Sequence, residues 1–257
     1  MMESGETNIH STSDSTPDKN LDEWLDRLPQ LSDAFLRRHQ RPLVTVSYAQ
    51  SVDGSIATYN KQQLQLSSGQ SMILTHRIRA SCDAIAIGIN TLLVDDPQLT
   101  VRLIEGRNPQ PIILDSNLRI PSQARILGRT DHSCLLACTD RTKNERIHEV
   151  ESLGAEVVRC RPDPRNRVDL MHLLDQLGRR GISSIMVEGG SQVITSFIES
   201  QLVDQMIITI APRLVGGLPI LGHPATINGT HLSLNPLSYR SCGPDIILWA
   251  QPQWHES

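Results

Sequence analysis

Carboxylate, hydroxyl and glycine residues gather at four places in the sequence, each directly after a short apolar run. In one of these, residues 88–97, Thr91 and Asp95 stand four positions apart. On a helical turn both side chains would project from one face, where they could bind hydroxyl groups of a ribose or a diphosphate-linked sugar. The alternative is that Thr91 only caps a short helix, which the Asp96–Pro97 turn then ends.

Two adjacent glycines follow a second apolar run, in Val-Glu-Gly-Gly-Ser-Gln at residues 187–192. At a strand-to-helix turn, Gly189 and Gly190 would leave backbone amides bare at a helix N-terminus, which is a general way to hold phosphate, and Ser191 could cap that helix. The pattern is neither a dinucleotide fingerprint nor a P-loop, so a tight turn without a ligand is the alternative. Glu188 ends a buried strand, which is costly unless a partner such as a substrate pairs with it.

The other two places carry weaker signals. Residues 49–54 contain Asp53 in an Asp-Gly pair, which fits a hairpin turn as well as a carboxylate at a site. Residues 211–217 could shape a pocket wall. Arg79 and Arg102 lie on either side of the first segment, and both are candidate phosphate ligands because a guanidinium binds phosphate bidentately. A solvated side chain is the alternative for each.

Other kinds of chemistry lack their sequence patterns. The nine His include no pair at metal-ligand spacing, and neither a zinc-deaminase signature nor a Gly-x-Ser-x-Gly turn occurs. The five Cys form no Cys-x-x-Cys pair, which indicates free thiols in a reducing compartment. We therefore expect no metal site. A diffusible dinucleotide remains as the chemical agent.

Composition argues against nucleic-acid and membrane partners. The 257 residues include only three Trp, three Tyr and two Phe, too few rings for base-stacking platforms, and the net charge is −4. No apolar run is long enough to span a membrane, and the polar N-terminus lacks a secretion signal. These observations favour a cytoplasmic protein that acts on a small molecule.

Short apolar runs alternate with helical patterns from residue 41 onward, which predicts an α/β domain with strands mostly buried on both faces. In such sheets ligands bind beyond the carboxyl ends of the strands, where the four polar segments lie. The expected strands are residues 43–49, 84–89, 111–115, 133–138, 155–160, 184–188, 205–212 and 245–250, and the expected helices are 71–81, 141–153, 168–180 and 191–201.

The chain ends differ from this pattern. Residues 1–19 are polar without periodicity and predict a disordered tail. Residues 21–39 have helical spacing, and Pro29 is expected to divide them into two short helices. We take residues 41–251 as one catalytic domain and residues 252–257 as a C-terminal tail.

The same segments resemble the riboflavin-biosynthesis reductase family. That family comprises the C-terminal reductase domain of the bacterial bifunctional deaminase-reductase and the stand-alone archaeal and fungal ribosylaminopyrimidine-phosphate reductases. The resemblance implies a dihydrofolate-reductase-like fold with a mostly parallel central sheet. It also implies a homodimer and NADPH-dependent reduction of a ribosyl side chain to ribityl. It extends over residues 41–251 and is carried, in the family's order, by VTVSYAQSVDGSIA, RIRASCDAIAIGINTLLVDDPQLTVR, NPQPIILDSNLRIP, VEGGSQVITSFIESQLVDQ and IAPRLVGG.

The resemblance also implies roles for individual residues. Asp95 and Glu188 are expected to position the reacting ends, and Asp53 matches the Asp of the family's Ser-x-Asp-Gly turn beside the active site. The residues expected to face the substrate are Arg79, Leu99, Arg102 and Glu188. The two arginines among them are expected to face its 5′-phosphate. The NADPH contacts are expected from Thr91, Asp95, Ser116, Gly189, Gly190, Ser191, Gln192 and Val193.

The sequence departs from the bifunctional bacterial members in two positions and in its extent. Those members commonly carry Lys at the position of Ser47 and Trp near Gln65, and they contain a deaminase domain. The departures favour a stand-alone reductase. The alternatives are a dihydrofolate-reductase-like enzyme acting on another pteridine or pyrimidine, and a non-catalytic nucleotide-binding protein.

Overall fold

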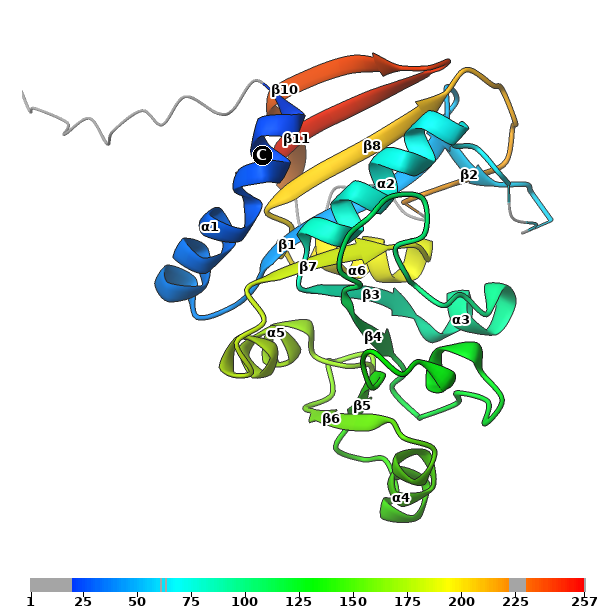
Figure 1. Ribbon diagram of the computed structural model, residues 1–257, viewed down its shortest axis with the longest axis vertical. Coiled ribbons are helices and arrows are strands. Elements are labelled where there is room, and N and C mark those ends of the chain that lie inside the picture. Colours follow the sequence, from blue (N-terminus) through cyan, green and yellow to red (C-terminus); the bar gives the residue numbers. More distant parts are fainter. Residues whose placement is uncertain (1–19, 61, 63, 222–229, 257) are drawn as a thin grey trace, which may run out of the picture.

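The computed structural model describes residues 20–60, 62, 64–221 and 230–256, so the expected tail at 1–19 lies outside it. Within these residues the main sheet has nine strands, with β10 and β11 at one edge and β6 at the other (Figure 1). In their order across the sheet the strands are β10 (Thr230–Cys242), β11 (Asp245–Glu256), β8 (Gln205–Ala211), β1 (Leu43–Ser51), β7 (Ser184–Glu188), β3 (Ala84–Gly88), β4 (Gln110–Leu114), β5 (Leu135–Thr139) and β6 (Glu156–Cys160).

Strand direction in this sheet is mostly parallel. Every neighbouring pair from β8 to β6 is parallel, whereas β11 pairs antiparallel with both β8 and β10. The expected α/β architecture is confirmed. The chain passes from β1 through β3, β4 and β5 to β6 and then returns to place β7 between β1 and β3. Ligands of open parallel sheets bind beside such a reversal, beyond the carboxyl ends of the strands.

Helices cover both faces of the sheet. In β3, Ile85 and Ile87 belong to the apolar cluster that contains α1, α2 and α4, while Ala84 and Ala86 face the cluster of α5 and α6. This alternation follows from the two-residue period of a strand. The helices are α1 (Leu21–His39), α2 (Gly69–Ser81), α3 (Ile89–Asp95), α4 (Asn144–Ser152), α5 (Leu170–Arg179) and α6 (Ser191–Glu199). None of the helices in the described ranges has the length and apolar character needed to cross a membrane.

The expected break at Pro29 is wrong, because α1 is one helix with Pro29 inside it. A proline removes one helical hydrogen bond, but tertiary packing can outweigh that loss. Leu25 and Leu28 are buried before the proline. After it, the buried Ser32 hydroxyl lies 3.0 Å from the Ser183 hydroxyl and donates to the Pro29 carbonyl at 3.0 Å. Both halves of the helix are therefore fastened to the same surface.

The C-terminal boundary also needs correction. β11 continues to Glu256, because Pro252 to Glu256 pair with β10, so a tail does not begin at residue 252. β10 itself was not predicted, and neither was a separate two-stranded sheet of β2 (Ser55–Ala57) and β9 (Leu218–Pro219). Each of the eight expected strands and four expected helices is present; β7 has the expected bounds, and the others are shifted at one or both ends.

Candidate active site

A cavity of about 1120 Å³ opens at the carboxyl ends of β3 and β4, between the start of α6 and the segment that follows β6. Its volume exceeds the usual range for drug-sized ligands, about 300–1,000 Å³, and suits a dinucleotide. Most of the residues expected to contact the cofactor line it: Thr91, Asp95, Ser116, Gly190, Ser191, Gln192 and Val193. Gly189 directly precedes this group.

Thr91 and Asp95 lie on α3, and both line the cavity, as their four-residue spacing predicts. Partial burial raises the pKa of the Asp95 carboxyl above its usual value. Thr91 packs directly against the glycine turn, because a Cβ placed on Gly190 would lie 2.8 Å from the Thr91 Oγ1. The turn and the α3 side chain therefore form one closely fitted wall.

The turn before α6 has the shape of a phosphate cradle. Gly189 and Gly190 have φ angles of +90° and +80°, which favour glycine. Gly190 is the residue that caps α6, so Ser191 is not the cap that we expected but the first helical residue. The first amides of a helix have no acceptor within it. Those of Ser191 and Gln192 are thus suited to a phosphate, and the residues present fit a dinucleotide.

Ser116 is fixed where it lines the cavity. Its carbonyl accepts hydrogen bonds from the Thr139 amide at 3.2 Å and from the hydroxyls of Thr139 and Thr142, each at 3.1 Å. Its own hydroxyl oxygen accepts from the Val168 amide at 3.2 Å. The segment after β4 is thereby joined to β5 and to the segment after β6, before any ligand binds.

The structure adds polar cavity residues that the sequence reasoning missed. Arg119 Nη2 donates to Asn90 Oδ1 at 2.9 Å, and Asn90 Nδ2 donates to Gln192 Oε1 at 3.0 Å, which connects the loop after β4 to α3 and α6. Arg167 also lines the cavity and donates to Ser196 Oγ at 2.9 Å. The sequence could have pointed to Arg119, because it lies inside the NPQPIILDSNLRIP segment that carries the family resemblance. Arg167 stands in a polar stretch that gives no such signal.

The residues expected to face the substrate meet on the α2 side of the sheet, outside the lining of the cavity. Arg79 Nε and Nη2 donate to the two carboxylate oxygens of Glu188 at 2.8 and 2.5 Å, and Arg79 Nη1 donates to the Thr100 carbonyl at 3.1 Å. The side chains are only 9% and 23% exposed. Although burial lowers the pKa of Arg79, the Glu188 carboxylate outweighs it and holds that pKa above its ordinary value.

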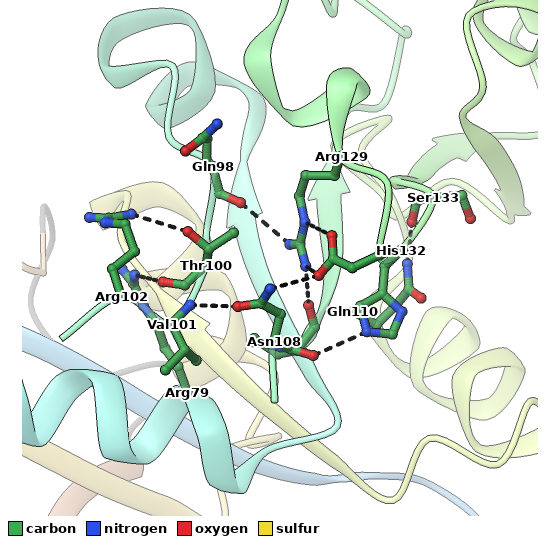
Figure 2. Close-up of polar contacts among 12 residues, drawn as sticks. Arg79, Gln98, Thr100, Val101, Arg102, Asn108, Gln110, Arg129, His132 and Ser133 are labelled. Atoms are coloured by element: carbon green, nitrogen blue, oxygen red, sulfur yellow. Dashed lines mark hydrogen bonds and ion pairs between the residues drawn. The ribbon is translucent and has the colours of Figure 1, made fainter. Parts of the chain in front are cut away.

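Leu99 and Arg102 stand next to this ion pair, on either side of Thr100. Leu99 is buried and Arg102 is exposed. The Arg102 amide donates to His76 Nδ1 at 2.9 Å, and Figure 2 shows the Arg102 side chain directed at Thr100. Burial lowers the pKa of His76, and the charges of Arg79 and Arg102 add to that effect. A neutral His76 therefore serves as acceptor for the Arg102 backbone.

Asp53 does not line the cavity but joins two loops beside it. Its carboxylate accepts hydrogen bonds from the Ser51 hydroxyl, from the Ser55 hydroxyl at 3.2 Å and from the Gly216 amide at 2.6 Å. These bonds, the Ser51 hydroxyl first, hold the pKa of Asp53 well below its usual range. The hydrogen bonds of Asp53 thus link the turn after β1 to the loop that leads into β9.

The family model for the RibD C-terminal domain matches residues 42–248, well over half of the chain. The chain belongs to this family. It is 38% identical over 187 residues to the 2,5-diamino-6-ribosylamino-4(3H)-pyrimidinone 5′-phosphate reductase of Archaeoglobus fulgidus, covering 69% of this chain and 83% of that protein. The reductase of the same name from Aquifex aeolicus is 36% identical over 182 residues, covering 69% of this chain and 80% of the relative.

Solved structures of the RibD family share this fold. Acinetobacter baumannii RibD matches with a TM-score of 0.76 at 23% identity, over 91% of this chain and 64% of that one. The Saccharomyces cerevisiae riboflavin biosynthesis reductase Rib7 matches with a TM-score of 0.68 at 24% identity, over 88% of this chain and 100% of that one. The expected fold class, α/β with a mostly parallel central sheet, is therefore shared with these structures.

The cavity of this RibD C-terminal domain contains no aromatic side chain among the described residues that line it. Its apolar wall consists of aliphatic residues, one methionine and prolines, which agrees with the scarcity of rings in the composition: Ile56, Ala57, Ile89, Leu93, Val94, Leu114, Pro162, Pro164, Val168, Leu170, Met171, Val193, Leu202 and Leu218. In the part of the chain that the structure describes, no group of three His, Cys, Asp or Glu side chains could hold a metal ion.

Replacing Asp53 with Asn should loosen the link between the two loops of this RibD C-terminal domain and lower its stability at neutral pH. Because the folded-state pKa of Asp53 lies below its ordinary value of about 3.9, its stabilisation is present above that pH and is lost as the pH falls toward the folded-state pKa. The wild type should be more stable than Asp53→Asn at pH 7, and the difference should shrink below about pH 4. Urea unfolding at pH 7 and pH 3 measures this difference in stability. A difference that is unchanged at pH 3 would contradict the stabilising role of the Asp53 carboxylate.

Proposed function

We propose that this chain is an NADPH-dependent reductase that converts the ribosyl side chain of a ribosylaminopyrimidine 5′-phosphate to ribityl in riboflavin biosynthesis. The main supporting observation is that two different sites adjoin the carboxyl end of β7. Gly190, just after β7, lines a dinucleotide-sized cavity, and Glu188, the last residue of β7, is held by Arg79 beside the exposed Arg102. Relatives that share 36–38% identity and most of their length with this chain carry the name of that reductase.

The cofactor would be held by groups that are already in place. Thr91 and Asp95 offer a hydroxyl and a carboxyl to the nucleotide, Ser116 supports it from the segment after β4, and the amides of Ser191 and Gln192 meet its phosphates. When bound, NADPH would supply the hydride that reduces C1 of the opened ribosyl group, and water or a substrate hydroxyl would supply the proton that completes the reduction.

We infer NADPH rather than NADH from one residue of the cavity lining, Arg119. Arg119 is 50% exposed and lines the cavity, where its guanidinium suits the phosphate that distinguishes the two dinucleotides. Arg167 is less available, because it donates to Asp163 at 3.1 Å and to Ser196.

Replacing Arg119 with Gln should therefore weaken NADPH more than NADH. A charge-assisted hydrogen bond is worth about 1.5–3 kcal/mol, so the Kd of NADPH should rise by roughly 10- to 100-fold while that of NADH changes little. Fluorescence titration of both dinucleotides checks this. Arg125→Gln is the matched control, because Arg125 is exposed and does not line the cavity. Equal losses for NADPH and NADH would contradict the assignment.

On the substrate side, Arg102 is the arginine that remains available for a 5′-phosphate. Arg79 is committed to Glu188 and to the Thr100 carbonyl, whereas the Arg102 guanidinium is exposed and donates to Thr100 Oγ1 at 3.4 Å. We assign Arg79 to orienting Glu188, whose carboxylate then has a single direction. Asp95, at the end of α3, and Glu188, at the end of β7, would position the reacting ends.

We further infer that the enzyme works in the cytoplasm as a homodimer. All five cysteines are free, which suits a reducing compartment. The edge strand β10 exposes Leu237 and Tyr239, and exposed apolar side chains on an edge strand are a feature of association surfaces. Light scattering on the purified protein measures the oligomeric state.

Steady-state assays of NADPH oxidation test the proposed function. The substrates are the deaminated ribosylaminopyrimidine 5′-phosphate, its non-deaminated form and dihydrofolate. We expect turnover with at least one of the two pyrimidines and none with dihydrofolate. Turnover of dihydrofolate alone would instead favour an enzyme of another pteridine. Binding of NADPH without any turnover would favour a non-catalytic protein.

A further inference from the structure

Leu99 has an unusual backbone conformation for a buried, bulky residue. Its side chain is 3% exposed and its φ angle is +55°, in the left-handed region. Such a conformation is unfavourable for leucine and persists only where its surroundings hold it. The carbonyls on either side of Leu99 are both bound by arginines: Arg129 Nη1 donates to the Gln98 carbonyl at 3.3 Å, and Arg79 Nη1 donates to the Thr100 carbonyl at 3.1 Å.

Arg129 fastens both ends of the segment that carries Leu99, residues 98–109, which we call the substrate loop. Besides the Gln98 carbonyl near the start of the loop, Arg129 Nη2 donates to the Pro109 carbonyl at its end, at 3.2 Å (Figure 2). The Arg129 side chain is 3% exposed and is itself fixed by Asp131, through bonds of 2.9 and 2.6 Å to the two carboxylate oxygens. These bonds hold the pKa of Asp131 well below its usual range.

Asn108 extends the brace into the middle of the substrate loop. Its Oδ1 accepts from the Val101 amide at 2.7 Å, and its Nδ2 donates to Asp131 Oδ2 at 2.8 Å. The Asp131 carboxylate therefore joins Arg129 and Asn108. On the opposite side, the loop touches α2, because a Cβ on Gly106 would lie 2.8 Å from the Ala80 Cβ. The loop is held from both directions.

We propose that Arg129 is a positioning residue, which holds the substrate loop so that Leu99 and Arg102 face the pyrimidine phosphate. This inference rests on the proposed function, because that function places Leu99 and Arg102 at the substrate. Arg129 does not line the cofactor cavity. Loss of Arg129 should thus weaken binding of the pyrimidine phosphate and leave binding of the dinucleotide unchanged, whereas a general loss of stability would weaken both.

A variant pair tests the proposal. In Arg129→Gln, we expect the KM for the pyrimidine phosphate to rise by about 10- to 100-fold, as for other small misplacements of binding groups, while the Kd of NADPH stays within about twofold. Arg129→Lys keeps the charge but not the fork that reaches two carbonyls, so it should recover only part of the loss. Amide hydrogen exchange at Val101 and Arg102 should accelerate in Arg129→Gln.

Arg146→Gln is the matched control, because Arg146 braces a different loop. From α4, Arg146 Nε and Nη2 donate to the carbonyls of Leu118 and Ile120 at 2.7 and 2.8 Å, next to the cavity residue Arg119. Arg146→Gln should raise the Kd of NADPH and leave the KM for the pyrimidine phosphate unchanged. Equal effects of both variants on the pyrimidine KM, or an unchanged KM in Arg129→Gln, would overturn the proposal.

The exchange measurement separates this proposal from the proposed function. If the wild type reduces neither pyrimidine, the proposed function fails, and exchange alone then decides whether Arg129 holds the loop. Faster exchange across residues 98–109 in Arg129→Gln, with unchanged exchange at residues 116–120, supports the brace. If residues 98–109 of Arg129→Gln exchange at the wild-type rate, the proposal is overturned.

Discussion

Gly190→Ala should raise the Kd of NADPH by about 100-fold, a loss of about 2.7 kcal/mol of binding free energy. The new Cβ would lie 2.8 Å from the Thr91 Oγ1, and Gly190 has a φ angle of +80° that alanine adopts only with strain. Thr91 is β-branched, so it can yield only by turning its hydroxyl to another rotamer. Either the turn or the Thr91 hydroxyl must leave its place. Fluorescence titration with NADPH measures the effect.

Gly154→Ala is the matched control for this prediction. Gly154 also has a left-handed backbone, with φ +89°, but a Cβ there would meet nothing within 4 Å. It should cost about 1–2 kcal/mol of stability through backbone strain and leave NADPH binding unchanged. If Gly190→Ala bound NADPH as the wild type does, the glycine turn would not be a phosphate cradle.

Arg79→Gln should disable the substrate side and destabilise the fold. Removing one partner of a buried ion pair typically costs 3–5 kcal/mol, and we expect about 3 kcal/mol because Glu188 keeps 23% exposure. The released Glu188 loses its fixed direction, so kcat/KM for the pyrimidine should fall by about 100-fold. Urea unfolding and steady-state kinetics measure the two effects separately.

Arg41→Gln distinguishes the catalytic loss from the loss of stability. Arg41 Nη1 and Nη2 donate to the Asp204 carboxylate at 2.7 and 2.8 Å, and both side chains are mostly buried. This pair lies before β1 and β8, at the amino ends of the strands, opposite the site. Its variant should lose similar stability and keep kcat/KM within about twofold. A comparable kinetic loss in Arg41→Gln would remove the special role of Arg79.

The sequence predicts that the residues around the cavity lie together, because most of them are neighbours in the sequence or follow adjacent strands. The parallel strands end at one edge, so loops that follow β3, β4 and β7 must meet there. Thr91 and Asp95 are related by one helical turn, and the glycines by adjacency. Periodicity and strand order are therefore enough to place Thr91, Asp95 and the turn at Gly190 around one cavity, whereas Ser116 is added only by the family resemblance.

The sequence does not reveal contacts that join distant residues through side-chain geometry. Arg79 and Glu188 are 109 positions apart, and each alone fits a solvated charge or a substrate ligand. Asp53 gives the signal of a hairpin turn or a site carboxylate, but its partner Gly216 is 163 positions away. Arg129 is buried by a loop with no apolar period. Such pairs depend on rotamers and loop paths that no local pattern specifies.

Two local rules mislead because tertiary structure overrides them. Pro29 predicts a helix break, yet packing and the bond between Ser32 and Ser183 keep α1 continuous. Pro236 argues against a strand at residues 230–242, yet β10 lies at the sheet edge, where a missing amide donor is tolerated. The register shift between Leu234 and Leu237 accommodates the proline there.

Isotope transfer tests the central claim most directly. The purified protein is supplied with NADPH carrying deuterium at both C4 positions of the nicotinamide and with the ribosylaminopyrimidine 5′-phosphate, and the product is analysed by mass spectrometry and NMR. We predict a ribityl product with one deuterium at C1, and unlabelled NADPH in D₂O should place none on that carbon. A ribityl product without deuterium from the labelled cofactor, or no product at all, would contradict direct hydride transfer in this site.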